Sequence, residues 1–196
     1  LPTVDEADID PLAPIDPPGQ MICVGLNYHD HAEEQDEEVP ERPLLFGKSP
    51  RSVANPGEPI VHPDAIDEVD YEVELAIVIG RTARNVDAAE AEEYVAGYTI
   101  FNDFSARDIQ NEEMTVGLGP GKGKDFANGF GPYLVTADAF DPADARMTAR
   151  VNGEVWCEGN SGEAHHSVGD MLEHAAMGET VHPGDVTEHL DEHAGL

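Results

Sequence analysis

Lysine is almost missing from this chain: Lys48, Lys122 and Lys124 are the only three among 196 residues. Together with arginine they make 10 basic residues against 41 acidic ones, a formal net charge of −31. Nucleic acid and anionic membrane surfaces would repel such a molecule, which argues against both as partners. Cysteine is also scarce, and the spacing of Cys23 and Cys157 fits no metal or redox motif. A reduced pair is the default expectation, with one disulfide left open.

Hydrophobic runs of membrane length are missing as well. No apolar stretch approaches the roughly 18 residues of a membrane helix, and the N-terminus has no signal-peptide pattern, so we expect a soluble, cytoplasmic protein. The acidic residues are spread along the chain rather than gathered in a tail. This composition is typical of extreme halophiles, in which abundant salt screens the self-repulsion. A disordered acidic protein is the competing interpretation, and the apolar stretches within the chain argue against it.

The chain divides into three predicted parts. Residues 1–20, rich in Pro and Asp, are expected to form an extended arm, 21–186 a single domain, and 187–196 an acidic tail without strand character. Short strand patterns alternate with helical ones inside the domain, which predicts a β-rich α+β fold. The expected strands include 21–25, 98–102, 132–136 and 149–155, and the expected helices are 88–96, 105–113 and 168–177.

Two glutamates separated by one residue are the most informative local feature. Glu72 and Glu74 stand at the start of a run that stays apolar through Ile79, and residues i and i+2 of a strand point to the same face. Both carboxylates would then lie at the entrance to a covered interior, where like charges need a cation to neutralise them. Asp103 follows another apolar stretch and could be a third ligand. The alternative is a solvated acidic face, which is common in so acidic a chain.

Four motif segments follow one another along the chain: Gly25-Leu26-Asn27-Tyr28-His29-Asp30-His31-Ala32-Glu33-Glu34, Asp70-Tyr71-Glu72-Val73-Glu74-Leu75, Asn102-Asp103-Phe104-Ser105-Ala106-Arg107-Asp108-Ile109-Gln110, and Gly121-Lys122-Gly123-Lys124-Asp125 with Gly131-Pro132. In this order and spacing they resemble the fumarylacetoacetate hydrolase superfamily over about residues 21–186. The later Val151-Asn152-Gly153-Glu154 and His182-Pro183-Gly184-Asp185-Val186 resemble further landmarks of that family. The resemblance implies a mixed β-sandwich roll, a divalent Mg²⁺, Mn²⁺ or Ca²⁺ site, and usually a homodimer.

The resemblance also implies individual roles. Glu72, Glu74 and Asp103 match the metal-binding carboxylates of the family, and an all-oxygen ligand set independently favours a hard cation. His31 and Glu34 match a His-x-x-Glu pair that activates water. Three residues apart on a helical turn, their side chains share a face, so the glutamate can orient the imidazole. An ordinary surface ion pair is the alternative for these two residues.

Three further residues complete the expected site. Lys122 matches the catalytic lysine of the family, which precedes the Gly-Pro pair by nine residues; a flexible loop with incidental charge is the alternative. Arg107 and Gln110 fall where family members contact substrate, although Arg107 could equally form a structural salt bridge. Asp108 is expected to support Arg107 or the metal shell.

By resemblance, the expected substrate is a 2-oxo acid, and the expected reaction is hydrolysis of a carbon–carbon bond in an acylpyruvate or a fumarylacetoacetate-like acid through a metal-stabilised enolate. Decarboxylation of oxaloacetate and isomerisation or hydration of unsaturated 2-oxo diacids remain alternatives on the same site. An incomplete, catalytically inactive family member is an alternative of another class, because residues 187–196 depart from the Thr-Gly-Thr-Pro-like segment that the family usually has there. A metal-buffering acidic protein is a weaker alternative.

Overall fold

The computed structural model describes residue 5 and residues 8–15, 17–28 and 38–191; for 189–191 it describes the backbone alone. Within these ranges no helix combines the length and the apolar character needed to cross a membrane. The two cysteines, Cys23 and Cys157, are buried thiols and form no disulfide.

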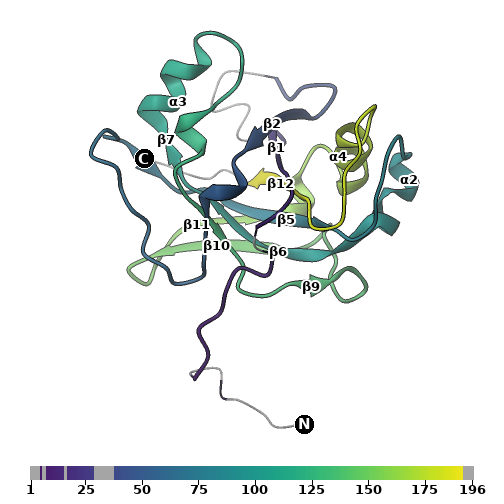
Figure 1. Ribbon diagram of the computed structural model, residues 1–196, viewed down its shortest axis with the longest axis horizontal. Helices are drawn as coiled ribbons and strands as arrows, with labels where there is room; N and C mark the ends of the chain where they lie inside the picture. The colour runs from purple at the N-terminus through teal and green to yellow at the C-terminus, as the bar shows by residue number, and fades with distance from the viewer. Residues whose placement is uncertain (1–4, 6–7, 16, 29–37, 192–196) are drawn as a thin grey trace.

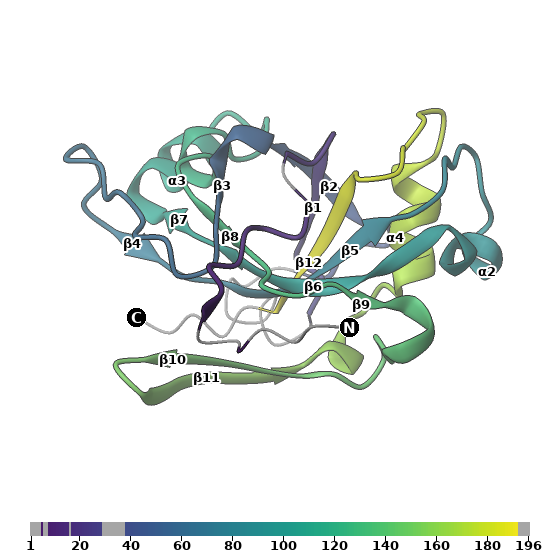
Figure 2. The same ribbon diagram turned by 60° about the horizontal axis from the view of Figure 1, so that its bottom comes forward.

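A curled mixed sheet dominates the structure (Figures 1 and 2). Its strands run in the order β2 (Leu44–Lys48), β1 (Met21–Gly25), β12 (Val186–Asp191), β5 (Val73–Ile79), β6 (Val95–Asp103), β8 (Asn128–Phe130) and β3 (Val53–Ala54), with β9 (Val135–Thr136) also beside β6. The pairs β1–β12 and β3–β8 are parallel, and the others in this sheet are antiparallel. Two small antiparallel pairs stand apart: β4 (Val69–Asp70) with β7 (Ser105–Ala106), and β10 (Arg146–Val151) with β11 (Glu154–Asn160). This arrangement confirms the β-rich α+β class expected from the sequence.

Strand β12 corrects one expectation. Residues from Thr187 onward were expected to lack strand character, yet the backbone continues in a strand to Asp191, parallel to β1 and antiparallel to β5. The physical reason is that two neighbouring strands offer unpaired hydrogen-bonding groups on both sides of this segment. Such non-local pairing outweighs the weak strand propensity of Glu, His and Asp.

Short helices connect the strands. They are α2 (Ala88–Ala91), which continues as the 3₁₀ turn η3 (Glu92–Tyr94), α3 (Arg107–Met114) and α4 (Val168–Ala175). The helix expected over 88–96 is shorter than predicted because Val95 and the residues after it join β6. At α4 the side chain of Ser167 accepts from the backbone N–H of Asp170, and the carboxylate of Asp170 accepts from the backbone N–H of Ser167. This capping box begins the helix at Val168, where the sequence predicts its start.

The main sheet has two differently covered faces. One face buries Met21, Ala76, Val78, Phe101 and Val186, and the N-terminal arm contributes Ala13 to the same cluster. The other face packs against α4 and the hairpin β10–β11. Figure 2 shows the hairpin as a separate layer below the sheet. Because Glu74 lies two residues before Ala76, it belongs to the first face, and the functional residues described next gather there.

Candidate active site

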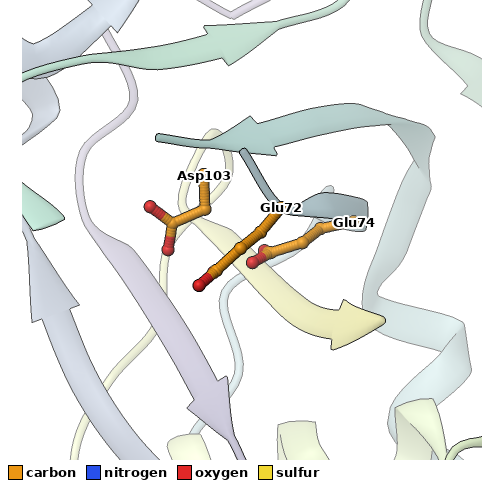
Figure 3. Close-up of side chains that lie close together, drawn as sticks. All are labelled: Glu72, Glu74 and Asp103. Atoms are coloured by element: carbon orange, nitrogen blue, oxygen red, sulfur yellow. The ribbon is translucent and has the colours of Figure 1, made fainter. Parts of the chain in front are cut away.

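Three buried carboxylates converge at the start of β5 and the end of β6 (Figure 3). Glu72 immediately precedes β5, Glu74 lies in it, and Asp103 ends β6. The backbone N–H of Asp103 donates to the carbonyl of Glu72 at 3.0 Å, which fixes the register of the two segments. Their side chains are at most 1% exposed, and each offers an oxygen within 4.8 Å of the others. Within the described part of the chain, this is the single group of three or more His, Cys, Asp or Glu residues close enough together to hold a metal ion.

Cationic side chains cover two of these three carboxylates. Lys124 Nζ lies 2.5 Å from Glu72 Oε2 and 3.2 Å from Asp103 Oδ2, and Lys48 pairs with the other oxygen of Asp103. Both lysines are buried. Burial alone would lower the pKa of Lys48, but the charges of Asp103 and Glu188 raise it above its usual value. The buried Lys48 therefore stays protonated, and its charge neutralises that of Asp103.

The two lysines of the glycine-rich loop differ in their environment. Lys122, the candidate from the family motif, is exposed, whereas Lys124 points into the carboxylate cluster. The turn η4 (Lys122–Lys124) is held by Glu113 of α3, whose carboxylate accepts from the backbone N–H groups of Gly121, Lys122 and Gly123 at 2.7, 2.7 and 3.1 Å. A side chain at Gly123 would come within 2.7 Å of the backbone of α3, so the close approach requires glycine. The structure thus brings Lys124 rather than Lys122 to the site.

Arg107 joins the cluster at the first turn of α3. Its guanidinium lies 2.7 Å from Glu72 Oε1 and donates two hydrogen bonds to Asp70 Oδ2, at 2.9 and 2.8 Å. It also donates to Gln110 Oε1 at 3.1 Å, so the two predicted substrate contacts lie together. Asp108 is oriented differently: its carboxylate accepts from the backbone N–H of Asp67 at 3.0 Å, a bond that lowers the pKa of Asp108.

Glu74 lies in the part of the cluster that has no ion pair to a lysine or arginine among the described residues. Glu188, which the motifs did not identify, lies there as well. Both side chains are buried, and none of their carboxylate oxygens has a hydrogen bond of ordinary geometry among the described residues. Burial, together with the charges of Glu188 and Asp103, raises the pKa of Glu74 well above its usual value. Burial likewise raises the pKa of Glu188 to about 7, although Lys48 acts in the opposite direction. The one sequence signal that could have identified Glu188 is its alternation with buried Val186.

The donor set fits a divalent cation. Glu74 leaves two buried carboxylate oxygens without a hydrogen bond, which is a costly arrangement unless a positive group meets them. Every candidate ligand atom in the group of three is a carboxylate oxygen, as Mg²⁺, Mn²⁺ and Ca²⁺ prefer. Glu72, Glu74 and Asp103 are therefore the residues that would hold the ion.

The histidines contribute little to the described site. His31 and Glu34, predicted to activate water, lie outside the described residues, as does His29. His166 has a structural role: its backbone N–H donates to Asn27 Oδ1 at 2.8 Å, and its ring lies 2.9 Å from the carbonyl of Pro40.

A cavity of about 830 Å³ opens beside Lys124 and Gln110. Strand β2, the end of α3 and the glycine-rich loop supply most of its walls, which are largely apolar. Its larger apolar side chains are Leu26, Leu44, Leu45, Phe46, Met114 and Leu118. The cavity therefore brings a small molecule into contact with Lys124 and Gln110.

Comparison with known proteins identifies the family of the chain. Residues 20–187 match the family described as fumarylacetoacetate (FAA) hydrolase C-terminal. The chain is 38% identical over 187 residues to human oxaloacetate tautomerase FAHD2A, mitochondrial, covering 95% of this chain and 60% of that protein. It is 37% identical over 183 residues to the fumarylacetoacetate hydrolase domain-containing protein 2 homolog of Dictyostelium discoideum, covering 89% and 60%. The chain thus spans about 60% of the length of these curated relatives.

Solved structures show the same fold. The 5-carboxymethyl-2-hydroxymuconate delta-isomerase of Mycobacterium smegmatis superposes with a TM-score of 0.85 at 38% identity, over 97% of this chain and 74% of that one. The fumarylacetoacetate hydrolase of Exiguobacterium antarcticum gives a TM-score of 0.82 at 41% identity, over 93% and 66%. The predicted mixed β-sandwich roll of this family is therefore confirmed.

Proposed function

Because the chain belongs to the fumarylacetoacetate hydrolase family, we propose that it is a divalent-metal-dependent enzyme that interconverts the keto and enol forms of an oxaloacetate-like 2-oxo acid. The buried group of Glu72, Glu74 and Asp103 carries this proposal, because its oxygens are close together and those of Glu74 lack a partner. The name of the human relative, an oxaloacetate tautomerase, supports this choice of substrate. Mg²⁺ and Mn²⁺ are the proposed ions.

The chain's own residues supply binding and charge. A 2-oxo acid entering through the cavity meets Gln110 and Lys124 on its wall, and Arg107 donates a hydrogen bond to Gln110. Lys124 is positioned to stabilise negative charge on the 2-oxo oxygen as a proton leaves carbon 3, because its ammonium group is buried and already oriented by two carboxylates. A bound divalent cation would supply Lewis-acid polarisation of the same oxygen.

Proton transfer completes the reaction. In the keto-to-enol direction a base removes the proton from carbon 3, the electron pair forms the new carbon–carbon double bond, and the 2-oxo oxygen takes up a proton. We assign the base to His31, oriented by Glu34, on the strength of the family motif. No atom is gained or lost, so the reaction needs no co-reactant.

Hydrolysis of an acylpyruvate is the second candidate, and the His31-x-x-Glu34 motif favours it. In this reaction His31 would deprotonate water, the hydroxide would add to the distal carbonyl, and cleavage would release a carboxylic acid and a pyruvate-type enolate that is then protonated. Decarboxylation of oxaloacetate needs no such water. An inactive family member and a homodimer also remain proposals.

Turnover of a substrate panel tests these choices. After chelator treatment, the protein in high salt is given enol-oxaloacetate, keto-oxaloacetate or acetylpyruvate, with and without Mn²⁺ or Mg²⁺. We expect metal-restored loss of the enol absorbance, and we expect Glu74→Gln to abolish it. Metal-restored acetylpyruvate cleavage would instead establish the hydrolase, and pyruvate release from oxaloacetate the decarboxylase. Full activity of Glu74→Gln would overturn the metal assignment, and inactivity on every substrate despite metal binding would favour an inactive family member.

A further inference from the structure

Glu188 lies beside the carboxylate cluster on a strand that the sequence motifs did not include. In β12 it is paired with Cys23 of β1 on one side and with Ala76 of β5 on the other. Paired residues of neighbouring strands share a face, so Glu188 lies on the same face as Ala76 and Glu74. Its side chain is 2% exposed. Glu188 therefore adds a fourth buried carboxylate near Glu74, on the same face of the sheet.

The lysines of the site form their ion pairs with Glu72 and Asp103 and not, among the described residues, with Glu74 or Glu188. Lys48 pairs with Asp103 and donates to Asn128 Oδ1 at 2.7 Å, and Lys124 bridges Glu72 and Asp103. All ten lysines and arginines of the chain lie in the described residues, and none forms an ion pair with Glu188 or Glu74 there. Both oxygens of Glu188 are buried without a hydrogen bond of ordinary geometry. Lys48 acts on both carboxylates only through its nearby charge, and two adjacent buried carboxylates without an ion pair of their own are unfavourable in the protein interior.

The balance of formal charge is consistent with a missing divalent ion. Asp70, Glu72, Glu74, Asp103 and Glu188 supply five carboxylates. Arg107, Lys48 and Lys124 supply three positive charges. With every group ionised, the described cluster carries a formal charge of −2, the charge that one divalent cation neutralises. Without Glu188 the charge would be −1, so Glu188 brings the cluster into balance with such an ion.

We propose that Glu188 is part of the divalent-cation site and helps Glu74 to hold the ion from the β12 side. The inference rests on the proposed function in one respect, that a hard divalent cation binds at Glu74. It goes beyond that function because it adds Glu188 of β12 as a residue that positions Glu74; Glu188 lies outside the group of Glu72, Glu74 and Asp103, whose oxygens lie within 4.8 Å of one another.

Manganese binding tests the proposal without reference to turnover. Metal-free wild type, Glu188→Gln, Glu188→Leu and Glu74→Gln are titrated with Mn²⁺ alone by calorimetry, and free Mn²⁺ is counted by electron spin resonance. Glu154→Gln is the matched control, since it removes one negative charge at an exposed position of the hairpin. We expect one ion per wild-type chain, unchanged affinity for Glu154→Gln, at least about tenfold weaker binding for both Glu188 variants, and loss of binding for Glu74→Gln.

The outcomes separate the inference from the proposed function. Binding by the Glu188 variants within twofold of wild type, while Glu74→Gln loses the ion, would overturn the role of Glu188 and leave the metal site intact. Absence of saturable binding by wild type would overturn both. Thermal unfolding in chelator establishes that each variant is folded, and the Mn²⁺-induced rise in melting temperature provides a second readout. We expect that rise to be smaller for Glu188→Leu than for wild type even where the apolar side chain stabilises the metal-free protein.

Discussion

The carboxylate cluster has two parts that differ in how their charge is met. Glu72 and Asp103 form the paired part, in which Arg107, Lys48 and Lys124 contact their oxygens. Glu74 and Glu188 form the unpaired part: they are equally buried, and no ion pair to either occurs in the described residues. The carboxylates of both parts are buried, so the two parts differ in their ion pairs and not in their depth of burial.

This difference separates folding from binding. In the paired part, the protein's own cations offset the cost of burying carboxylates, so the fold already satisfies these groups. In the unpaired part the cost remains, and the free energy of binding the proposed ion would stabilise the protein. The unpaired glutamates therefore indicate where the proposed ion would contribute most, and the paired ones hold the surrounding framework.

The largest effect expected from this comparison is a contrast in stability between two glutamate-to-glutamine substitutions. In chelator, Glu72→Gln should lower the free energy of unfolding by about 3 kcal/mol, because it leaves the buried Lys124 with one carboxylate fewer. Glu74→Gln removes an unpaired buried acid, and should leave the free energy of unfolding unchanged or raise it by about 1 kcal/mol. Urea unfolding at constant high salt measures both.

Mn²⁺ supplies the control for this contrast. Saturating ion should stabilise wild type and should not stabilise Glu74→Gln. Equal destabilisation by the two substitutions in chelator would contradict the division into a paired and an unpaired part.

Local patterns in the sequence predict part of this site correctly. The Glu-x-Glu spacing at Glu72 and Glu74 requires only the two-residue period of a strand, and the structure brings both to Asp103. The start of α4 at Val168 is likewise set by local residues, and the predicted start of this helix is confirmed. Roles for His31, Glu34 and Lys122 stay predictions, because the resemblance alone supports them.

Non-local contacts account for what the sequence did not predict. Strand β12 exists because β1 and β5 lie on either side of it, and those strands are distant from it in sequence. Glu188 became a candidate only once that pairing was known. Similarly, two lysines in one loop cannot be distinguished by spacing; the carboxylate of Glu113 orients the turn so that Lys124 faces inward.

Substitution of Lys124 and substitution of Lys122 should affect turnover very differently. Lys124→Met should lower kcat/KM about 100-fold on the active substrate of the panel, since it removes a buried donor from the position where negative charge would develop in the proposed reaction. Lys122→Met should stay within about twofold of wild type because Lys122 is exposed. Steady-state kinetics with saturating Mn²⁺ measures both variants. The reverse order would return the catalytic role to Lys122, as the family motif predicts.

The last expected effect, modest at each step of one pH unit, is a pH dependence of stability to which Glu188 in the unpaired part contributes. In metal-free protein the pKa of Glu188 is about 7, above its usual 4.5, so between these values the folded state holds a proton that the unfolded state releases. The free energy of unfolding should then decrease as pH rises through this window, by up to about 1.4 kcal/mol per pH unit for one group. Urea unfolding of wild type and Glu188→Gln from pH 4.5 to 7 measures this slope.

Glu188→Gln should show a shallower slope than wild type because glutamine does not titrate. Saturating Mn²⁺ should reduce or reverse the wild-type slope, because the ion binds ionised carboxylates and binds more tightly as they lose their protons. Glu74, whose pKa is also raised by burial, would maintain part of the slope in the glutamine variant. Identical slopes for the two proteins in chelator would mean that the charge of Glu188 is already met in the metal-free fold. The two parts of the cluster would then differ at Glu74 alone.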